Sequence, residues 1–211
     1  MISEKTRIGR LAERGVTDRN VIYDILDEGF LCHAAYVIDE RPVVIPTLYA
    51  RSAHTLLLNG SNSSGLVRAV RSESPLSVAV THVDGLVVAR SGFHSSANYR
   101  SVVIHGRGLL LEGEEHLKAL DVIVDALIPG RVANSRAPTE AEYKQTSVIA
   151  LSLDEMSAKV RSGGPHDDPE DLDSDTWAGV VPMRLVAGIP EPADNLAEGI
   201  VVPEYLQPYR R

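Results

Sequence analysis

A run of hydroxyl side chains between two glycines is the first feature of the sequence that could do chemistry. The run GSNSSG at 60–65 places Ser61, Ser63 and Ser64 directly before an apolar stretch typical of a short helix. Hydroxyls and free backbone N–H groups at the start of a helix favour an anion such as a phosphate. Arg68 follows one turn later and adds a cation. The alternative is a plain serine N-cap, since serine is a favoured capping residue.

A second polar stretch, HSSANYRS at 94–101, lies between two apolar strand-like runs. Loops between rigid strands commonly carry functional sites. Arg100 and Ser101 stand where the next strand begins, which favours contact with an anion or with the edge of a bound ring. The alternatives are an ordinary polar loop and, for Arg100, a surface salt bridge to an acidic segment near the C-terminus.

Several other chemistries lack the residues they need. Apolar residues follow the glycine pair where a P-loop requires Lys and Ser or Thr, and no G-x-S-x-G elbow is present, which argues against nucleotide triphosphate hydrolysis and a serine hydrolase. The run 171–175 begins like a calcium loop, but Thr176 and Pro182 replace the required glycine and glutamate. Cys32 is the only cysteine and the seven histidines are scattered, so we expect no structural metal site, while a single histidine as a haem ligand stays open.

Length and composition favour one folded, cytoplasmic domain of bacterial type. The 211 residues are 44% hydrophobic, which suits a globular core. A formal net charge of -8 disfavours a nucleic-acid partner. No apolar run approaches the roughly 18 residues that span a bilayer, and the polar start does not resemble a secretion signal, so we expect no membrane partner.

The negative charge is concentrated near the C-terminus. Residues 163–199 hold nine acids and one base, and the remainder of the chain is balanced. We therefore expect a main domain at 1–162 and an acidic, Pro/Gly-rich extension at 163–211, whose late strand packs on the same domain.

Apolar periodicity predicts a mainly β fold with helical additions. A helix is expected from Thr17 or Asp18 to Glu28, ended by a left-handed Gly29, and a second helix at 114–128. The Asp84-Gly85 pair predicts a hairpin turn. The expected strands are 30–39, 43–51, 54–60, 76–83, 86–90, 101–112, 148–156 and 177–187. Short antiparallel steps of this kind indicate a small closed or partly closed barrel.

The order of these pieces resembles the flavin-binding split-barrel proteins related to pyridoxamine 5'-phosphate oxidase, most closely the branch that includes nitroimidazole-resistance proteins. The resemblance rests on the segments 23–51, 56–70, 84–110 and 177–185. It implies a six-stranded antiparallel split β-barrel that forms a homodimer and binds FMN at the subunit interface.

The resemblance also implies roles for individual residues. The backbone of Pro46, Thr47, Leu48 and Tyr49 would lie along the isoalloxazine ring, and Ser61, Ser63 and Ser64 would hold the phosphate. Ring and phosphate contacts would come from Asn98, Tyr99, Arg100, Ser101 and Val102. Trp177, a late aromatic residue, would close the site, from the same or from the other subunit.

The chain departs from the oxidase at two points. The phosphate loop lacks the Arg/Lys pair, so the cation would have to be Arg68 or Arg100, and Arg100 is favoured because it leads directly into an apolar strand. The C-terminal substrate-binding arginine motif is not apparent, which disfavours pyridoxamine phosphate oxidation.

The function expected on these grounds is a flavin-dependent oxidoreductase that acts on a small molecule such as a nitroaromatic compound. The alternatives are a non-catalytic flavin or haem carrier or sensor, and a deazaflavin-dependent reductase. The expected partners are a second copy of the chain and a small-molecule substrate.

Overall fold

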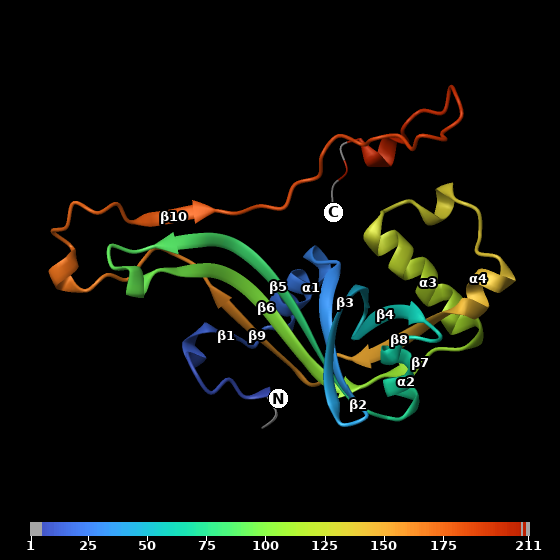
Figure 1. The fold of residues 1–211 in the computed structure, drawn as a ribbon, viewed down its shortest axis with the longest axis horizontal. Helices are drawn as coiled ribbons and strands as arrows, with labels where there is room; N and C mark the ends of the chain where they lie inside the picture. The colour runs from blue at the N-terminus through green and yellow to red at the C-terminus, as the bar shows by residue number, and fades with distance from the viewer. Residues whose placement is uncertain (1–5, 208, 210–211) are drawn as a thin grey trace.

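The computed structural model describes residues 6–207 and 209, which form mainly antiparallel sheet with a few helices (Figure 1). The strands are β1 (Gly15–Val16), β2 (Leu31–Ile38), β3 (Arg41–Ser52), β4 (Thr55–Ser61), β5 (Pro75–Val88), β6 (Ser96–Arg107), β7 (Leu109–Leu110), β8 (Thr146–Ser152), β9 (Met156–Arg161) and β10 (Gly179–Pro182). The α-helices are α1 (Arg19–Glu28), α2 (Gly65–Arg71), α3 (Gly113–Leu127) and α4 (Glu140–Gln145). Short 3₁₀ turns are η2 (Ala12–Arg14), η3 (Gly92–His94), η4 (Val132–Asn134), η5 (Pro169–Asp171) and η6 (Glu204–Leu206).

The described strands join in one ten-stranded sheet, so the prediction of six strands is wrong in number. The order is β1-β9-β6-β5-β2-β3-β4-β8-β7, and β10 pairs with β5. Two of the additional strands, β1 and β7, have two residues each and lie at the ends of the strand order. β10 occupies the middle of the strand expected at 177–187. Elements this short leave no periodic pattern in a sequence.

The expected single strand at 148–156 is two strands joined by a tight turn. Ser152 Oγ accepts a hydrogen bond from the Asp154 backbone N–H at 3.2 Å and so stabilises this turn. β8 pairs with β4 and β9 pairs with β6, so the chain passes here from one half of the barrel to the other.

The predicted hairpin at Asp84-Gly85 is also wrong. β5 continues through both residues and pairs with β6 along its length, with a register shift between Val83 and Gly85 that marks a β-bulge. A Cβ at Gly85 would meet Val180 Cγ1 and Val181 O at 3.0 Å, so glycine is needed for the close approach of β10. The chain instead reverses at 89–95, after β5 has ended.

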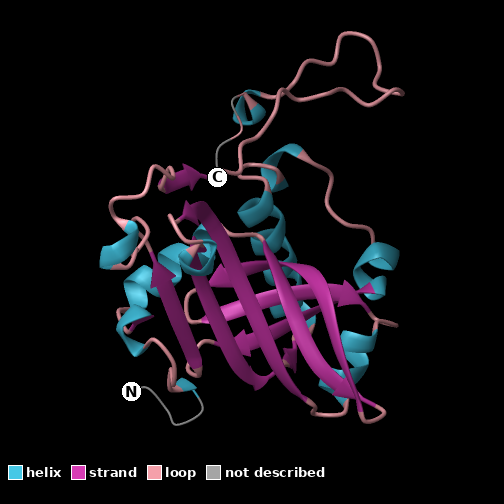
Figure 2. Ribbon diagram, turned by 60° about the vertical axis from the view of Figure 1, so that its left-hand side comes forward, coloured by secondary structure: helices cyan, strands magenta, loops and turns pink. Residues whose placement is uncertain are grey.

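Helices lie on both sides of the curved sheet and behind it (Figure 2). Asp18 caps α1 by accepting a hydrogen bond from the Asn20 N–H at 2.9 Å, and α1 buries Ile22, Ile25 and Leu26 in the barrel core. α3 packs Ala119 and Ile123 on a second apolar cluster formed with β3, β4 and β8. No helix in the described ranges combines the length and the apolar character needed to cross a membrane.

Strand alternation leaves the other side of the sheet open. Cys32, Ala34, Val78 and Val102 point into the core, and their neighbours along each strand point outward. We call this outward side the outer face; it consists of Leu31, His33, Ala35, Val37, Val44, Pro46, Leu48, Ser77, Ala79, Thr81, Ser101, Val103 and His105. Leu31, Val37 and Val44 are 47–62% exposed, so the outer face presents a broad apolar surface.

Gly29 follows α1 in an extended conformation (φ -92°, ψ 161°), which contradicts the predicted left-handed residue. After Gly29, the chain enters β2 directly. Glycine is needed at this position because there is no room for a side chain. A Cβ there would lie 2.5 Å from Tyr49 Oη and 2.9 Å from His82 Cε1.

Gly29→Ala is therefore expected to lower the free energy of unfolding by about 1–2 kcal/mol, because the barrel end must shift to admit a methyl group. Urea denaturation measures this change. Gly92→Ala is the matched control, since a Cβ at Gly92 meets nothing within 4 Å. Equal stability of the two variants would show that the barrel end adjusts freely.

Candidate functional site

The hydroxyl-rich loop lies between the end of β4 and the start of α2. Ser64 is the N-cap of α2, and its Oγ accepts a hydrogen bond from the Val67 N–H at 3.2 Å. The capping alternative therefore holds for Ser64. Ser61 and Ser63 are exposed, with their hydroxyl oxygens 3.0 Å apart, and they present hydroxyls to solvent on one side of the loop.

Two arginines on α2 bring positive charge to this loop. α2 buries Leu66, Val67, Ala69 and Val70, which turns Arg68 and Arg71 to the opposite side. Arg71 contacts the carbonyl and the side-chain oxygen of Asn62 at 3.3 and 3.4 Å. Arg68 is exposed, and its guanidinium has no hydrogen-bond or ion-pair partner among residues 6–207 and 209. It shares a helix face with Arg71 at i, i+3 spacing. Sequence reasoning missed Arg71, although that spacing was visible.

A cavity of about 240 Å³ adjoins the same loop. Its lining includes Asn62, Arg71, His116, Tyr143 and Lys144, together with Leu110, Leu111, Glu112, Gly113, Thr146 and Ser147. Asn62 fixes the loop to this wall, because its N–H donates to Gln145 O at 3.0 Å and its side chain bonds Ser147 and the carbonyl of Lys144.

His116 is the most enclosed titratable side chain in this cavity wall. It is 7% exposed, and its ring centroid lies 4.4 Å from that of Tyr143. Burial lowers the pKa of His116, so the neutral ring is favoured. The sequence did not single this residue out, because α3 reads as an ordinary amphipathic helix.

The four residues expected along the ring divide between the two sides of β3. Pro46 and Leu48 point outward, opposite His33 and Leu31 of β2. Thr47 Oγ1 donates to Asn59 O at 3.3 Å, and the buried Tyr49 donates to Leu26 O at 2.6 Å. Only the first pair presents side chains on the outer face.

The predicted residues of β6 divide in the same way. Val102 is in the core, and Asn98 is buried, with its amide donating to Gly163 O at 3.0 Å and its oxygen accepting from Arg161. Tyr99 and Ser101 are half-buried, and Ser101 lies on the outer face. The outer face therefore gathers Pro46, Leu48 and Ser101 from the predicted set.

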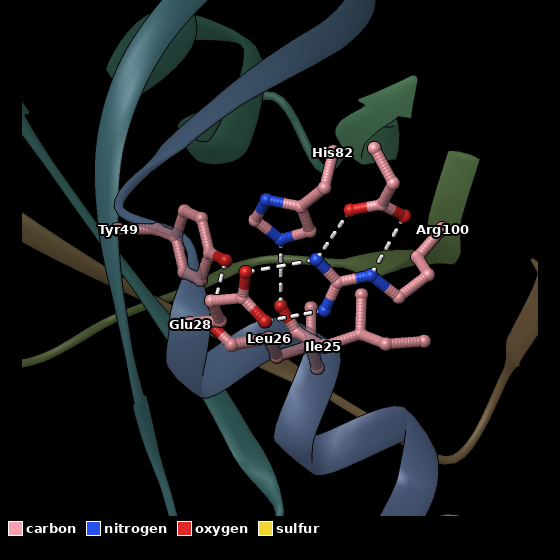
Figure 3. A network of polar contacts seen from close by, with 7 residues as sticks. Ile25, Leu26, Glu28, Tyr49, His82 and Arg100 are labelled. Carbon is pink, nitrogen blue, oxygen red and sulfur yellow. Dashed lines mark hydrogen bonds and ion pairs between the residues drawn. The ribbon is translucent and has the colours of Figure 1, made fainter. Parts of the chain in front are cut away.

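Arg100 is held by two carboxylates (Figure 3). Its guanidinium donates to Asp84 at 2.9 and 2.7 Å and to Glu28 through two further hydrogen bonds, one of 2.8 Å. These bonds raise the pKa of Arg100, and its hydrogen bond lowers the pKa of Glu28. The salt-bridge alternative was right in kind but wrong in its partner, which is not the acidic extension. Contact between Arg100 and a cofactor stays a prediction and would require the guanidinium to leave these carboxylates.

The same network completes the end of α1. The last carbonyls of a helix lack partners within it. His82 Nε2 donates to Ile25 O at 2.9 Å, and the Tyr49 hydroxyl reaches Leu26 O, as Figure 3 shows. A cation at a helix C-terminus is also favoured by the helix dipole, so Arg100 has a structural role here.

Trp177 lies far from the serine loop within one chain. It precedes β10, and its ring covers Gly179, where a Cβ would be 2.9 Å from Trp177 Cζ2. β10 pairs with residues 85–88 of β5, whereas the C-terminal end of α2, the helix that follows the loop, adjoins the start of β5. A separation of ten or more strand residues is about 30 Å. A contact of Trp177 with a site at the serine loop, made from the other subunit, stays a prediction.

Within residues 6–207 and 209, we find neither a reactive thiol at Cys32 nor a metal site among the acidic side chains. Burial raises the pKa of the Cys32 thiol to about 12, which suits a small core residue. No group of three or more His, Cys, Asp or Glu in these ranges is arranged to hold a metal ion.

Two solved structures resemble the chain over nearly its whole length. The FAD and heme binding protein from Mycobacterium smegmatis is 36% identical, with 92% of this chain and 96% of that chain covered and a TM-score of 0.89. The flavocytochrome Anf3 from Azotobacter vinelandii is 33% identical, with coverages of 99% and 97% and a TM-score of 0.93.

A putative 5-nitroimidazole antibiotic resistance protein from Bacteroides thetaiotaomicron shares the fold at 18% identity, with coverages of 69% and 86% and a TM-score of 0.59. The comparison with curated proteins found no match. The family model described as pyridoxamine 5'-phosphate oxidase matches residues 18–160, which include the barrel strands β2 to β8 and the serine loop. The chain belongs to this pyridoxamine 5'-phosphate oxidase-like family of split-barrel proteins.

Proposed function

We propose that the protein is a flavin-binding oxidoreductase that works as a homodimer. The observation that carries the proposal is the identity of 33–36%, over 92–99% of the chain, to a flavocytochrome and to an FAD and heme binding protein. The site geometry supports it, because the serine loop could hold a phosphate and the outer face, which includes β3 next to β4, could hold an apolar ring.

The residues of the loop fit a phosphate group. Ser61 and Ser63 offer exposed hydroxyls, and Arg68 offers a guanidinium with no partner in the described chain. Charge-assisted hydrogen bonds of this kind are stronger than neutral ones. Pro46 and Leu48 would contact the ring on the outer face. A bound flavin supplies hydride and electron transfer, while the protein binds and orients it.

The cavity beside the loop has cationic side chains that could hold the part of FAD that FMN lacks. FAD carries a second phosphate and an adenosine beyond the flavin phosphate. Arg71 and Lys144 line the cavity of about 240 Å³ that adjoins Asn62 of the loop. The M. smegmatis relative is also described as FAD binding. We therefore propose FAD as the resident flavin, with FMN as the alternative outcome.

The proposal of a homodimer is supported by the apolar surface that one chain leaves uncovered. The outer face exposes Leu31, Val37 and Val44, and pockets for cofactors often form between subunits. Trp177 reaches such a site only from the second copy. The enclosed space would admit a small, electron-poor substrate such as a nitroaromatic compound.

Haem binding is the second candidate function, favoured by the descriptions of the two relatives above 30% identity. His33 is exposed on the outer face, and its imidazole makes no hydrogen bond to the described residues, so the ring is open to a ligand.

Absorption spectroscopy of the purified full-length protein tests both candidates. We expect a flavin spectrum, and chromatography of the released cofactor separates FAD from FMN; a Soret band reports haem. Consumption of NAD(P)H with a nitroaromatic substrate distinguishes an enzyme from a carrier. A colourless protein that takes up neither FAD nor FMN would overturn the proposal.

Ser61→Ala combined with Ser63→Ala is expected to weaken flavin binding by about 1–2 kcal/mol, since two hydrogen bonds to a charged group are lost. Fluorescence titration of the apoprotein measures the dissociation constant. Ser162→Ala, at an exposed serine with no hydrogen bond in the described chain, is the control. Unchanged affinity in the double variant would leave the loop as a simple helix cap.

A further inference from the structure

The segment after β10 exposes almost all of its side chains. We call residues 183–201 the arm; every residue in it except Pro190 is exposed. Leu185 is 87% exposed and Ile189 is 91% exposed. The large apolar residues of the arm are Met183, Leu185, Val186, Ile189, Leu196, Ile200 and Val201. So many exposed apolar side chains in one segment mark a contact surface.

Both ends of the arm are fixed to the body of the molecule (Figure 1). On one side β10 pairs with β5. On the other side, Tyr205 Oη accepts a hydrogen bond from Arg131 at 3.3 Å, and the Tyr209 hydroxyl donates to Leu127 O. Between these anchors, Met183 N donates to Asp84 O at 3.0 Å, and the other backbone hydrogen bonds of the arm close local turns. The arm is thus held at its ends with its apolar side chains uncovered.

The outer face is a second uncovered apolar surface on the same chain. Leu86 of β5 pairs with Val181 of β10, and both are exposed, so the arm leaves the sheet at the margin of this surface. Two such surfaces on one chain can cover each other reciprocally in a two-fold symmetric dimer, where the arm of each copy meets the outer face of the other.

We propose that the arm of each copy docks on the second copy of this chain and forms part of the dimer interface. Because both ends of the arm are fixed, its exposed apolar side chains do not fold back on their own chain. The surface that covers them must then come from another molecule. The arm carries Glu191, Asp194 and Glu198 against the single base Arg184, which disfavours nucleic acid as the occupant. The proposal rests on the homodimer of the proposed function and adds an exchange of arms to it.

The first test is a double variant, Leu185→Asp with Ile189→Asp, in the full-length chain. Both side chains are exposed in the single chain, so the fold should persist, which circular dichroism checks. We expect the dimer dissociation constant from analytical ultracentrifugation to rise at least 100-fold. Leu172→Asp is the matched control, an exposed leucine outside the arm, and should leave the constant unchanged.

The second test asks which chain the arm touches. Ile189 is replaced by p-benzoylphenylalanine, and isotope-labelled and unlabelled copies are mixed before irradiation. We expect crosslinked peptides that join a labelled chain to an unlabelled one. Crosslinks confined to one chain, a dimer constant unmoved by the double variant, or a monomeric wild-type protein would each overturn the proposal.

Flavin content is measured in the same samples, so that the two proposals fail separately. A dimer with exchanged arms but no flavin uptake contradicts the proposed function and leaves the arm contact standing. A flavin-loaded dimer that the double variant does not weaken contradicts the arm contact alone.

Discussion

Arg68→Ala should lower flavin affinity about 10- to 150-fold, which corresponds to the 1.5–3 kcal/mol of a hydrogen bond to a charged group. The serine loop contains no Lys or Arg, and a phosphate dianion without a cation is costly to enclose. Arg68 is the arginine on this side of α2 whose guanidinium is free in the described chain, and it stands four residues after the Ser64 cap. Fluorescence titration of flavin into the apoprotein measures the effect.

Three matched variants sharpen this expectation. Arg68→Lys should recover part of the affinity, because the charge remains and the planar fork is lost. Arg71→Ala should have a smaller effect on FMN than on FAD, since Arg71 faces the adjoining cavity. Arg100→Ala should retain flavin, because the Arg100 guanidinium is already paired with the carboxylates of Glu28 and Asp84. Loss of flavin in the Arg100 variant alone would restore the cation assignment made from the sequence.

Arg100→Ala should instead lower the free energy of unfolding by about 1–3 kcal/mol. The variant leaves the carboxylates of Glu28 and Asp84 side by side without their cation and frees the end of α1. Solvent screens the ion pair, because the Glu28 side chain is 54% exposed, so we expect a loss nearer the lower end of this range. Chemical denaturation at neutral pH measures the loss, and Arg19→Ala, on the exposed side of α1, is the control.

The ion pair between Arg100 and Glu28 should also affect how the stability of the protein depends on pH. Arg100 lowers the pKa of Glu28 in the folded protein below its ordinary value of 4.5, so the unfolded chain binds a proton more readily. The contribution is therefore fully present above pH 4.5 and is lost as the pH falls through the lowered pKa. In Arg100→Ala this part of the acid dependence should disappear. An unaltered pH profile would place the stabilising contact elsewhere.

Local patterns in the sequence identified most of the fold. The amphipathic period of α1 and its Asp18 cap, the runs that became β2 to β4, and the helix at α3 are all visible in the chain because each element buries one regular face. What these patterns did not reveal depends on distant partners. Asp84-Gly85 has the composition of a turn, and only pairing with β6 and β10 makes it a bulge.

The candidate site was predictable to a similar degree. The serine loop and Arg68 follow from residue types at a helix start. Arg100 was assigned to the cofactor because the sequence places it beside an apolar strand, while its carboxylate partners lie 16 and 72 residues away. The cavity with His116 and Lys144 is assembled from α3 and α4, which no local motif connects to the loop.

The far end of α1 has a consequence for how the molecule opens. Most helix ends fray, because their last carbonyls bond only to water. Here the partners of Leu26, Ile25 and Glu28 lie 23, 57 and 72 residues further along the chain, on β3, β5 and β6. These three contacts can form only once the strands are in place, so they tie the last turn of α1 to the assembled barrel. Its amide protons should exchange with solvent through the global opening of the protein, as slowly as those of the central strands.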